Sequence, residues 1–479
     1  MANFWDFSVW GTFNLIAVLL ISLLVANILK KTVKFLRVSL IPTSVLGGLL
    51  LLAVAAVYGA ITDENMFDTA FFGGDGASGL EIITYHALAL GFIATGLKIS
   101  DKKITKERSV EIFNTGVTTV STYLVQGVVG LGITLIASLI MTDFFAAAGV
   151  LLPFGYGQGT GQALNYGSIY ESDYGFVGGK SFGLTIAALG FLSASIGGVI
   201  HLNILKKKGK IKLEPLMDEK LSSESVQEDG EIPMNGSMDK LTVQIALIAL
   251  TYLVSYLIMW GLGLLLPGMR SVVYGFNFLI GVLVAALVKA VLKGLRKKKI
   301  LKKKYVNNFL MTRVSNACFD VMVVAGIAAI RLDVLKSYWL VIIILGVVGA
   351  FITYYYNLFV ARKLFKNYSE EQFLMMYGML TGTASTGVIL LRELDGDFKT
   401  PVADNLVYQN FPAIVFGFPM MLLATLAPKR PVLTLIILAV FLLAMNILLF
   451  RKQIFSRKKD VEQISETAAI EASTEETNE

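Results

Sequence analysis

Cysteine and histidine are nearly absent from this 479-residue chain. A single cysteine, Cys318, excludes an internal disulfide and a cysteine-rich metal site, and we expect it to be a small buried apolar residue. The two histidines, His86 and His201, are too few for a histidine metal site. No nucleophile–base pair or metal-binding cluster stands out, so we expect neither an enzyme nor a bound cofactor.

Charge is also scarce. Charged residues make up 16% of the chain, whereas soluble domains carry about 25%. Hydrophobic residues make up 55%, and the mean hydropathy is +0.67. The net charge of +7 is spread over short runs between apolar stretches, which is typical of membrane-flanking loops and does not indicate a nucleic-acid surface. The chain is therefore predicted to be an all-α integral membrane protein that lies in the lipid bilayer.

A membrane-spanning helix needs about 20 mainly apolar residues. Eleven stretches approach this requirement. The first is expected to be a span rather than a cleavable signal peptide, because acidic Asp6 precedes it and no small-residue cleavage site follows. The predicted spans are 8–29, 39–60, 82–97, 112–141, 181–205, 241–266, 272–292, 308–330, 337–360, 403–427 and 431–450.

Lysine and arginine are concentrated in every second connection between these spans. The connection 61–80 has neither, and contains four acidic residues. Because positively charged loops stay in the cytoplasm, the N-terminus is predicted outside and the C-terminus inside. The basic segments are 30–37, 98–108, 206–212, 296–304, 362–366 and 451–459.

Two further apolar segments, about 145–170 and 372–392, are interrupted by glycine, serine and threonine. If either crossed the membrane, every later basic connection would lie outside. We therefore interpret both as re-entrant hairpins, the first entering from outside and the second from the cytoplasm. The alternative is a pair of kinked, tightly packed helices, since small residues also favour close helix packing.

These segments divide the chain into two halves of opposite topology. Residues 1–205 are predicted to form five spans and one hairpin, and residues 241–428 repeat this order upside down. A cytoplasmic linker is predicted at 206–240, an extra span at 429–451 and a disordered cytoplasmic tail at 452–479. An inverted repeat with broken segments in matching positions is typical of secondary transporters, in which the broken segments form the substrate site.

The two interrupted segments provide the predicted substrate site. N–H groups at a break attract carboxylates, carbonyl and hydroxyl oxygens suit an alkali cation, and glycine permits close approach. Arg392 could bind a carboxylate with two hydrogen bonds. The alternative is that Arg392 only flanks the membrane and that the hydroxyl groups only cap helices. The predicted substrate-binding residues are Gly159, Thr160, Gly161, Gln162, Asn165, Thr383, Ser385, Thr386, Gly387 and Arg392.

A lone carboxylate in the middle of a span indicates a cation site. Asp320 lies four residues after Asn316 and so on the same helix face, and a charge at that depth is costly unless it has a function. The alternative is a structural pair or hydrogen bond. The predicted cation-binding residues are Asp320, Asn316, Gly96, Gly326 and Asn410, and the transported cation is Na⁺, with H⁺ as the alternative.

Four places in the chain, within about residues 20–425, resemble the sodium/glutamate symporter family of bacteria. They are Leu40-Ile41-Pro42 followed by residues 45–50; Phe92 through Gly96-Leu97; Gly157-Gln158-Gly159-Thr160-Gly161 with Tyr174-Gly175-Phe176 and Gly197-Gly198; and Asn316 with Gly382 through Gly387. The resemblance implies two inverted five-span halves with one re-entrant loop each. It also implies glutamate uptake coupled to sodium entry across the bacterial plasma membrane, usually by a homodimer.

The chain departs from that family pattern at several positions. Gln158 stands where well-known members carry histidine, Ser385 stands near an expected proline, and Asp320 and Arg392 stand where neutral residues are expected. We therefore retain two alternatives. In the first, the same fold carries another organic anion. In the second, the protein is a cation/proton exchanger in which Asp320 carries the proton.

Overall fold

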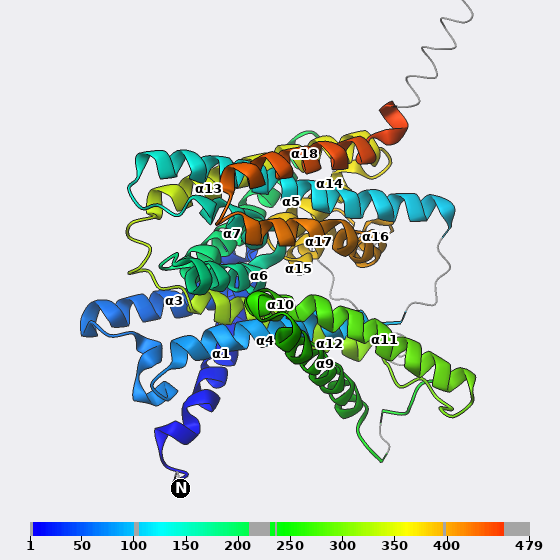
Figure 1. The fold of residues 1–479 in the computed structure, drawn as a ribbon. Coiled ribbons are helices and arrows are strands. Elements are labelled where there is room, and N and C mark those ends of the chain that lie inside the picture. The colour runs from blue at the N-terminus through cyan, green and yellow to red at the C-terminus, as the bar shows by residue number, and fades with distance from the viewer. Residues whose placement is uncertain (1–2, 100–104, 210–229, 235–236, 396–398, 455–479) are drawn as a thin grey trace, which may run out of the picture.

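Helices make up most of the structure (Figure 1). The computed structural model describes residues 3–99, 105–209, 230–234, 237–395 and 399–454. Ten helices within these ranges are long and apolar enough to cross a membrane. The same ranges contain no β-strand, only an isolated bridge between Glu231 and Lys304. The prediction of an all-helical membrane protein with many spans is confirmed.

Each predicted span corresponds to helical structure. The long helices are α1 (Phe7–Thr32), α3 (Thr43–Thr62), α4 (Gly76–Leu97), α5 (Lys106–Ile140), α7 (Gly179–Lys207), α9 (Lys240–Leu265), α11 (Asn277–Lys297), α12 (Asn308–Ala328), α13 (Trp339–Leu364) and α18 (Pro431–Leu449). The stretch 403–427 differs, because it is divided into α16 (Val402–Tyr408) and the 17-residue α17 (Asn410–Leu426). Pro412 lacks the N–H that would bond the carbonyl of Tyr408, which explains the interruption there.

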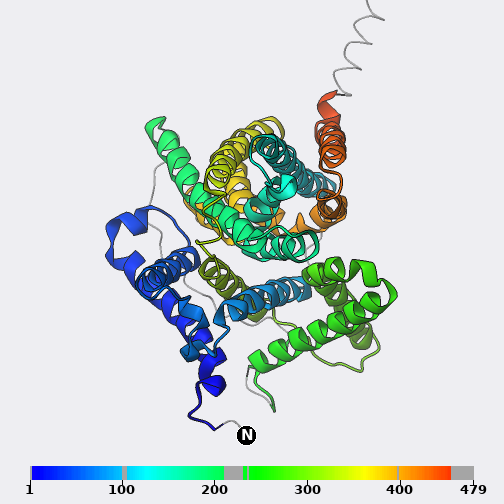
Figure 2. The same ribbon diagram turned by 60° about the vertical axis from the view of Figure 1, so that its left-hand side comes forward.

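The helices separate into two groups (Figure 2). The α4 group, as we call it, consists of α1, α3, α4, α9, α11 and α12. The α5 group consists of α5, α6 (Leu151–Tyr174), α7, α13, α14 (Ser369–Thr381), α15 (Ala384–Arg392), α16, α17 and α18. The groups meet mainly where α4 and α12 pack against α6. Each group therefore combines segments from the first and the second half of the chain.

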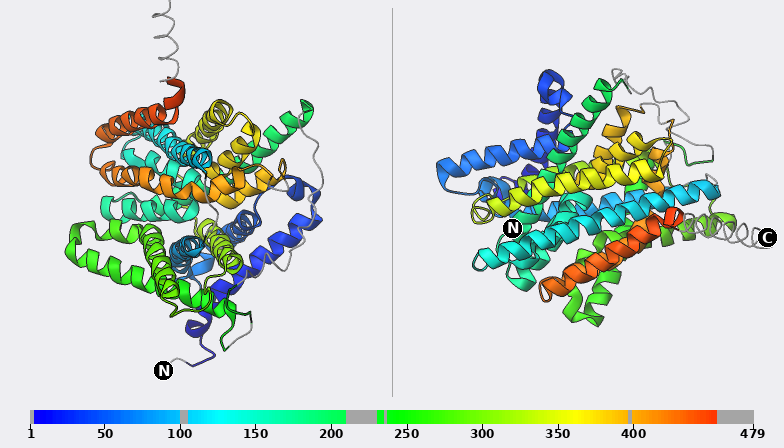
Figure 3. Two further views of the ribbon diagram at one scale, coloured as in Figure 1. Left: turned by 90° about the vertical axis from the view of Figure 1, so that its right-hand side faces the viewer. Right: turned by 90° about the horizontal axis from the view of Figure 1, so that it is seen from above.

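The helix connections form two sets that lie at opposite ends of the helices (Figure 3). Among the connections predicted to be cytoplasmic, the N–H of Ile99 donates to Oδ1 of Asn308 at 2.9 Å. Among those predicted to be outside, the hydroxyl of Ser271 donates to Oδ1 of Asp173 at 3.2 Å. One hydrogen bond thus joins two of the basic connections, and another joins two of the outer connections.

The first interrupted segment folds back on itself at Gly159, whose φ of 79° and ψ of −170° break the helix within α6. Phe154 and Tyr166 would be about 18 Å apart along a straight helix. Their rings instead stack with centroids 3.8 Å apart. The two ends also meet, since the rings of Phe145 and Phe176 stack at 4.6 Å. This segment is a helical hairpin that begins and finishes at the same end of the molecule.

The second interrupted segment is also a helical hairpin, formed by α14 and α15. The chain leaves the helical conformation at Gly382 and Thr383, and Thr383 Oγ1 accepts a hydrogen bond from the N–H of Thr386 at 3.4 Å, which caps α15. The arms pack so closely at Gly387 that a Cβ there would lie 2.5 Å from the carbonyl oxygen of Met375. Glycine is therefore required at position 387 by the packing of the two arms.

The extra C-terminal helix α18 packs along α5. Two hydrogen bonds fix it: the hydroxyl of Tyr356 donates to Oδ1 of Asn446 at 2.8 Å, and Arg451 donates to Oδ1 of Asn114 at 3.1 Å. Most of the predicted linker 206–240 and nearly all of the predicted tail 452–479 lie outside the described residues.

Candidate functional site

The breaks of the two hairpins meet. A Cβ placed on Gly159 would lie 3.7 Å from Cγ2 of Thr383 and 3.8 Å from the carbonyl oxygen of Gly382. The second arm of each hairpin starts at this junction, so the N-terminal turns of residues 160–174 and of α15 both begin here. The first N–H groups of a helix have no partner within that helix. The junction therefore brings two sets of backbone donors together.

A cavity of about 200 Å³ lies beside this junction, between the α4 group and the α5 group. Its aromatic lining includes Phe92, Phe278 and Phe319 from the α4 group. Its polar lining comes from both hairpins and from α4, α5 and α17: Thr95, Thr119, Tyr123, Gln158, Gln162, Thr383, Ser385, Gln409 and Asn410. Four residues predicted from the sequence, Gln162, Thr383, Ser385 and Asn410, are thus brought together.

The amide of Gln162 is the most unusual group in this lining. Its residue is only 1% exposed, yet neither Nε2 nor Oε1 has a hydrogen-bond partner among the described residues. A buried polar group without a partner costs about 1–3 kcal/mol. The amide carries both a donor and an acceptor, so it can pair at once with an anionic group and with an ammonium group or cation.

A hydrogen-bonded pair on the opposite wall joins α5 to α17. The hydroxyl of Thr119 donates to Oε1 of Gln409 at 2.9 Å. Nε2 of Gln409 lies 3.3 Å from Oδ1 of Asn410 and 3.5 Å from the sulfur of Met379. These contacts fix the Gln409 side chain, and they present Asn410 beside the cavity at the helix interruption caused by Pro412.

No aspartate, glutamate, lysine, arginine or histidine is among the described residues that line this cavity. Polar groups in the lining are hydroxyls, amides and backbone atoms of the hairpin breaks. Such a lining provides partial charges of both signs without a fixed net charge. The charge of a bound anion would therefore be fully balanced only if a cation also bound nearby.

Several predicted substrate residues serve the packing of the hairpins. A Cβ on Gly161 would lie 2.7 Å from Cδ1 of Leu88. Thr160 is fully buried, its hydroxyl donates to the carbonyl of Met322 at 3.4 Å, and its Cβ would lie 2.7 Å from a Cβ on Gly326. These contacts bind the first hairpin to α4 and α12 rather than forming part of the cavity lining.

Other predicted residues lie away from the cavity. Nδ2 of Asn165 donates to the carbonyl of Gly275 at 3.1 Å, beside a separate hollow of about 410 Å³ that also contains Tyr85. Gly96 packs against Ala285 of α11. Arg392 is half-buried at the end of α15 and is not part of the cavity lining.

Asp320 also lies outside the cavity lining. Its carboxylate is beside the hydroxyl of Ser44, in the first turn of α3. Asn316 is on the same exposed face of α12 and does not line the cavity. The cavity is lined by a different face of that helix, through Phe319 and Met322.

Sequence reasoning missed Thr119, Tyr123 and Thr95 as lining residues. Thr119 and Tyr123 are one turn apart on α5, which was predicted only as a span. A threonine and a tyrosine within an apolar stretch are common in membrane helices, and their spacing alone does not tell which neighbour they face. Tyr123 donates to the carbonyl of Gly157 at 3.1 Å and so also holds the first hairpin.

Comparison with known protein families gives a match for this chain. The family model for the sodium/glutamate symporter matches residues 9–384, which is more than three quarters of the chain. No curated protein sequence matches the chain. The family is one of membrane transporters that use sodium, in agreement with the ten candidate spans. On this match the chain belongs to the sodium/glutamate symporter family.

Proposed function

We propose that the protein couples sodium entry to the uptake of glutamate, and that both bind at the cavity where the hairpin breaks meet. The observation that carries this proposal is the Gln162 amide, which is buried in the cavity lining without a partner for its oxygen or its nitrogen. An amino acid presents a carboxylate to accept from Nε2 and an ammonium group to donate to Oε1. A bound amino acid would thus remove the cost of the unpaired amide.

The size of the cavity supports a small solute. Sites for drug-sized ligands have volumes of about 300–1,000 Å³. The cavity of about 200 Å³ is smaller and suits a molecule of amino-acid size. The aromatic rings of Phe92 and Phe278 would cover the methylene groups of the substrate.

The neutral lining supports coupling to a cation. Glutamate carries one net negative charge at neutral pH, and burying it in a site without a fixed positive charge is unfavourable. Backbone N–H groups at the starts of the second arms compensate part of this charge. A Na⁺ ion bound to carbonyl and hydroxyl oxygens at the breaks would compensate the rest. Each solute therefore favours binding of the other, which is the thermodynamic requirement for coupling.

The orientation of the chain is part of the proposal. Each hairpin returns to the end of the molecule at which it begins, and each helix group combines matching segments from the two halves. This arrangement supports an inverted repeat with two re-entrant hairpins, entering from opposite sides. The basic connections support a cytoplasmic C-terminus in a bacterial plasma membrane. We retain the homodimer implied by the family resemblance, which a mass measurement of the purified protein in detergent would test.

A cation/proton exchanger is the less favoured function. It would need a titratable group in contact with the transported cation, and the described cavity lining contains no carboxylate. Transport of another organic anion by the same site is the closer alternative. A dicarboxylate without an ammonium group would leave Oε1 of Gln162 unpaired, whereas an amino acid would not.

Uptake by proteoliposomes tests the function. We expect a sodium gradient to drive accumulation of radiolabelled glutamate, and unlabelled glutamate to compete better than a dicarboxylate of the same length without an amino group. Equal uptake under a choline gradient would disprove sodium coupling. Sodium-driven uptake of the dicarboxylate alone would show that glutamate is not the substrate, but it would leave the proposed sodium coupling intact.

A paired substitution tests the site. Gln162→Met keeps the length of the side chain and removes both polar atoms. We expect it to raise KM for glutamate about 5- to 100-fold, corresponding to about 1–3 kcal/mol. Gln372→Met is the matched control, because Gln372 is equally buried at 1%, lies in the other hairpin and does not line the cavity. If both variants change KM alike, the cavity is not the substrate site.

A further inference from the structure

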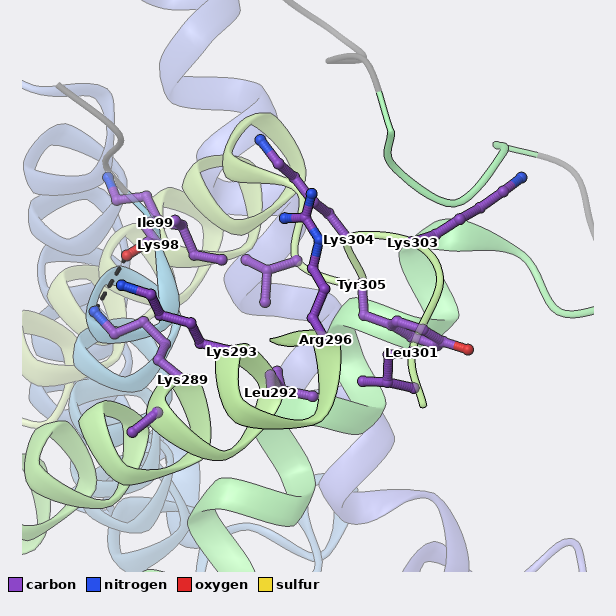
Figure 4. Close-up of a pocket in the computed structure, with 12 residues that line it drawn as sticks. Lys98, Ile99, Lys289, Leu292, Lys293, Arg296, Leu301, Lys303, Lys304 and Tyr305 are labelled. Carbon is purple, nitrogen blue, oxygen red and sulfur yellow. Dashed lines mark hydrogen bonds between the residues drawn. The ribbon is translucent and has the colours of Figure 1, made fainter. Parts of the chain in front are cut away.

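A second cavity, of about 310 Å³, lies at the end of the α4 group and is strongly basic (Figure 4). Lys98 follows α4, while Lys289, Lys293 and Arg296 come from successive turns of α11. Lys303 belongs to the lining but extends away from the other cations in Figure 4. No acidic residue is among the described residues that line the cavity.

Lys98, Lys289, Lys293 and Arg296 have no carboxylate partner among the described residues. Nζ of Lys289 donates to the backbone carbonyl of Lys98 at 3.2 Å, and Nζ of Lys98 lies 3.4 Å from the hydroxyl of Thr312. Burial lowers the pKa of Lys98, which is at the end of α4 just beyond the span. An anion in the cavity would reverse this effect by stabilising the charged amine.

The wall opposite α11 is held in place by contacts outside the cavity. The N–H of Lys304 donates to the carbonyl of Gly230 at 2.8 Å, and Nε2 of Gln244 donates to the carbonyl of Tyr305 at 2.9 Å. The buried ion pair between Lys240 and Glu231, with 2.7 Å between Nζ and Oε2, anchors the same segment. The cavity is therefore shaped before any ligand binds, which reduces the entropic cost of binding.

The lining is amphipathic. Besides the cations, the lining contains Ile99, Leu292, Leu301 and Val306, which are all apolar. A free inorganic anion would gain no binding free energy from these apolar side chains, whereas a lipid places a charged phosphate next to its glycerol and acyl carbons. The cavity lies where α4 ends and α12 begins, so it is at the level of the lipid headgroups. Basic pockets between helices at this depth are suited to anionic lipids.

We propose that this basic cavity binds the phosphodiester headgroup of an anionic phospholipid, with Lys98, Lys289, Lys293 and Arg296 around the phosphate. The proposal is independent of the transported solute. With the predicted orientation the lipid belongs to the cytoplasmic leaflet. Because the site joins α4, α11 and the connection before α12, its occupation stabilises the α4 group.

Native mass spectrometry of the full chain in detergent tests the proposal, with phosphatidylglycerol as the probe and phosphatidylcholine as the neutral reference. We expect wild-type protein to retain phosphatidylglycerol selectively. Each cation near a membrane surface contributes roughly a fivefold gain in affinity. The variant Lys289→Gln, Lys293→Gln, Arg296→Gln should therefore bind phosphatidylglycerol on the order of a hundredfold more weakly.

The matched control removes three cations from the end of α7, by Lys206→Gln, Lys207→Gln and Lys208→Gln. We expect its affinity to stay within about twofold of wild type, since these residues line none of the described cavities. Equal losses in both triple variants would overturn the proposal in favour of diffuse charge attraction. Displacement of the lipid by excess inorganic phosphate would overturn the lipid as the ligand.

The single variant Lys293→Gln keeps the test valid if the triple variant does not fold. Lys293 is exposed and forms no described ion pair, so the substitution is compatible with the fold. We expect about fivefold weaker retention of phosphatidylglycerol and a smaller lipid-induced rise in Tm. Unchanged retention with an unchanged Tm response would contradict the proposal.

Discussion

Gly159 and Thr383, from the two hairpins, face each other across 3.7 Å, measured from the position of a Cβ on Gly159 to Cγ2 of Thr383. The space around Gly159 is sufficient for a methyl group, because its three nearest neighbours are 3.7–3.9 Å away. The backbone is the constraint: φ of 79° with ψ of −170° is a region that only glycine adopts readily. The junction depends on this conformation rather than on a small side chain.

Substitution of Gly159 by alanine should therefore strain the break without a steric clash. We expect the free energy of unfolding to fall by about 1–3 kcal/mol. We also expect a strong decrease of transport, because the second arm of the first hairpin would no longer present its N-terminal turn to the cavity. Gly132→Ala in α5 is the control, since Gly132 is helical with nothing within 4 Å of an added Cβ. Normal transport by Gly159→Ala would show that the break does not shape the site.

Thr119→Val tests the opposite wall of the cavity. The substitution keeps the shape and removes the hydrogen bond to Oε1 of Gln409. We expect KM to rise roughly fivefold, corresponding to about 1 kcal/mol, as the Gln409 amide loses its orientation. Thr251→Val is the control, because Thr251 is fully buried and donates only to Leu247 of its own helix. An unchanged KM in Thr119→Val would show that the Thr119–Gln409 pair is not part of the substrate site.

The helices could be predicted from the sequence because lipid requires long apolar helices, whatever the order of their residues. The two breaks could also be predicted, since glycine and small polar residues interrupt otherwise apolar stretches at positions 159 and 382. The division of 403–427 was missed, although Pro412 is visible in the sequence. Its missing N–H interrupts the helix without ending it.

The side chains that face the cavity were harder to predict. Gly161 and Gln162 are neighbours in the chain, yet the first packs against Leu88 while the second lines the cavity. A sequence gives the spacing of residues around one helix but not which neighbouring helix lies on each face. For the same reason Thr119 appeared to be an ordinary residue of a span, and Asp320 appeared central although it lies at the seam of α12 and α3.

Cysteine labelling tests the orientation of the chain. In a Cys318→Ala background, Asn65→Cys and Asp173→Cys should react with an impermeant thiol reagent added to intact cells, because both positions are exposed at the predicted outer end. Ile300→Cys, 64% exposed at the opposite end, should react only after the cells are opened. Labelling of position 300 in intact cells would reverse the topology.

Glu370 provides a prediction on pH. The hydrogen bond from His201 at 2.8 Å, with the charges of His201 and Arg362, lowers the pKa of Glu370 from its ordinary value of 4.5 to about 2. A lowered carboxyl pKa contributes stability that is present above the unfolded value and lost as the pH falls through the folded value.

Glu370→Gln should therefore lower Tm at neutral pH, and its difference from wild type should shrink as the pH falls below about 4, where wild-type Glu370 begins to protonate in the unfolded state. Thermal unfolding in detergent across this range measures the difference. Glu64→Gln, at an exposed position, is the control and should change Tm little at any pH. A difference that grows on acidification would disprove the ion pair.

Asp320 can be assigned to one of two roles by a single substitution. Its carboxylate lies beside the hydroxyl of Ser44, in the first turn of the 20-residue helix α3, where the helix dipole stabilises a negative charge. It does not line the cavity. If Asp320 has a structural role, its substitution should change the stability of the α4 group. If it has the cation-binding role predicted from the sequence, its substitution should change the sodium dependence of uptake.

We expect Asp320→Asn to lower the stability by about 0.3–2 kcal/mol, because the neutral amide no longer compensates the dipole of α3, and to leave the sodium dependence of uptake unchanged. The measurements are Tm in detergent and glutamate uptake against sodium concentration. Asp333→Asn, which removes an exposed charge outside the spans, controls for the change in net charge. Loss of sodium dependence at an unchanged Tm would instead establish Asp320 as a cation ligand. The coupling ion would then bind at the seam of α3 and α12, apart from the substrate.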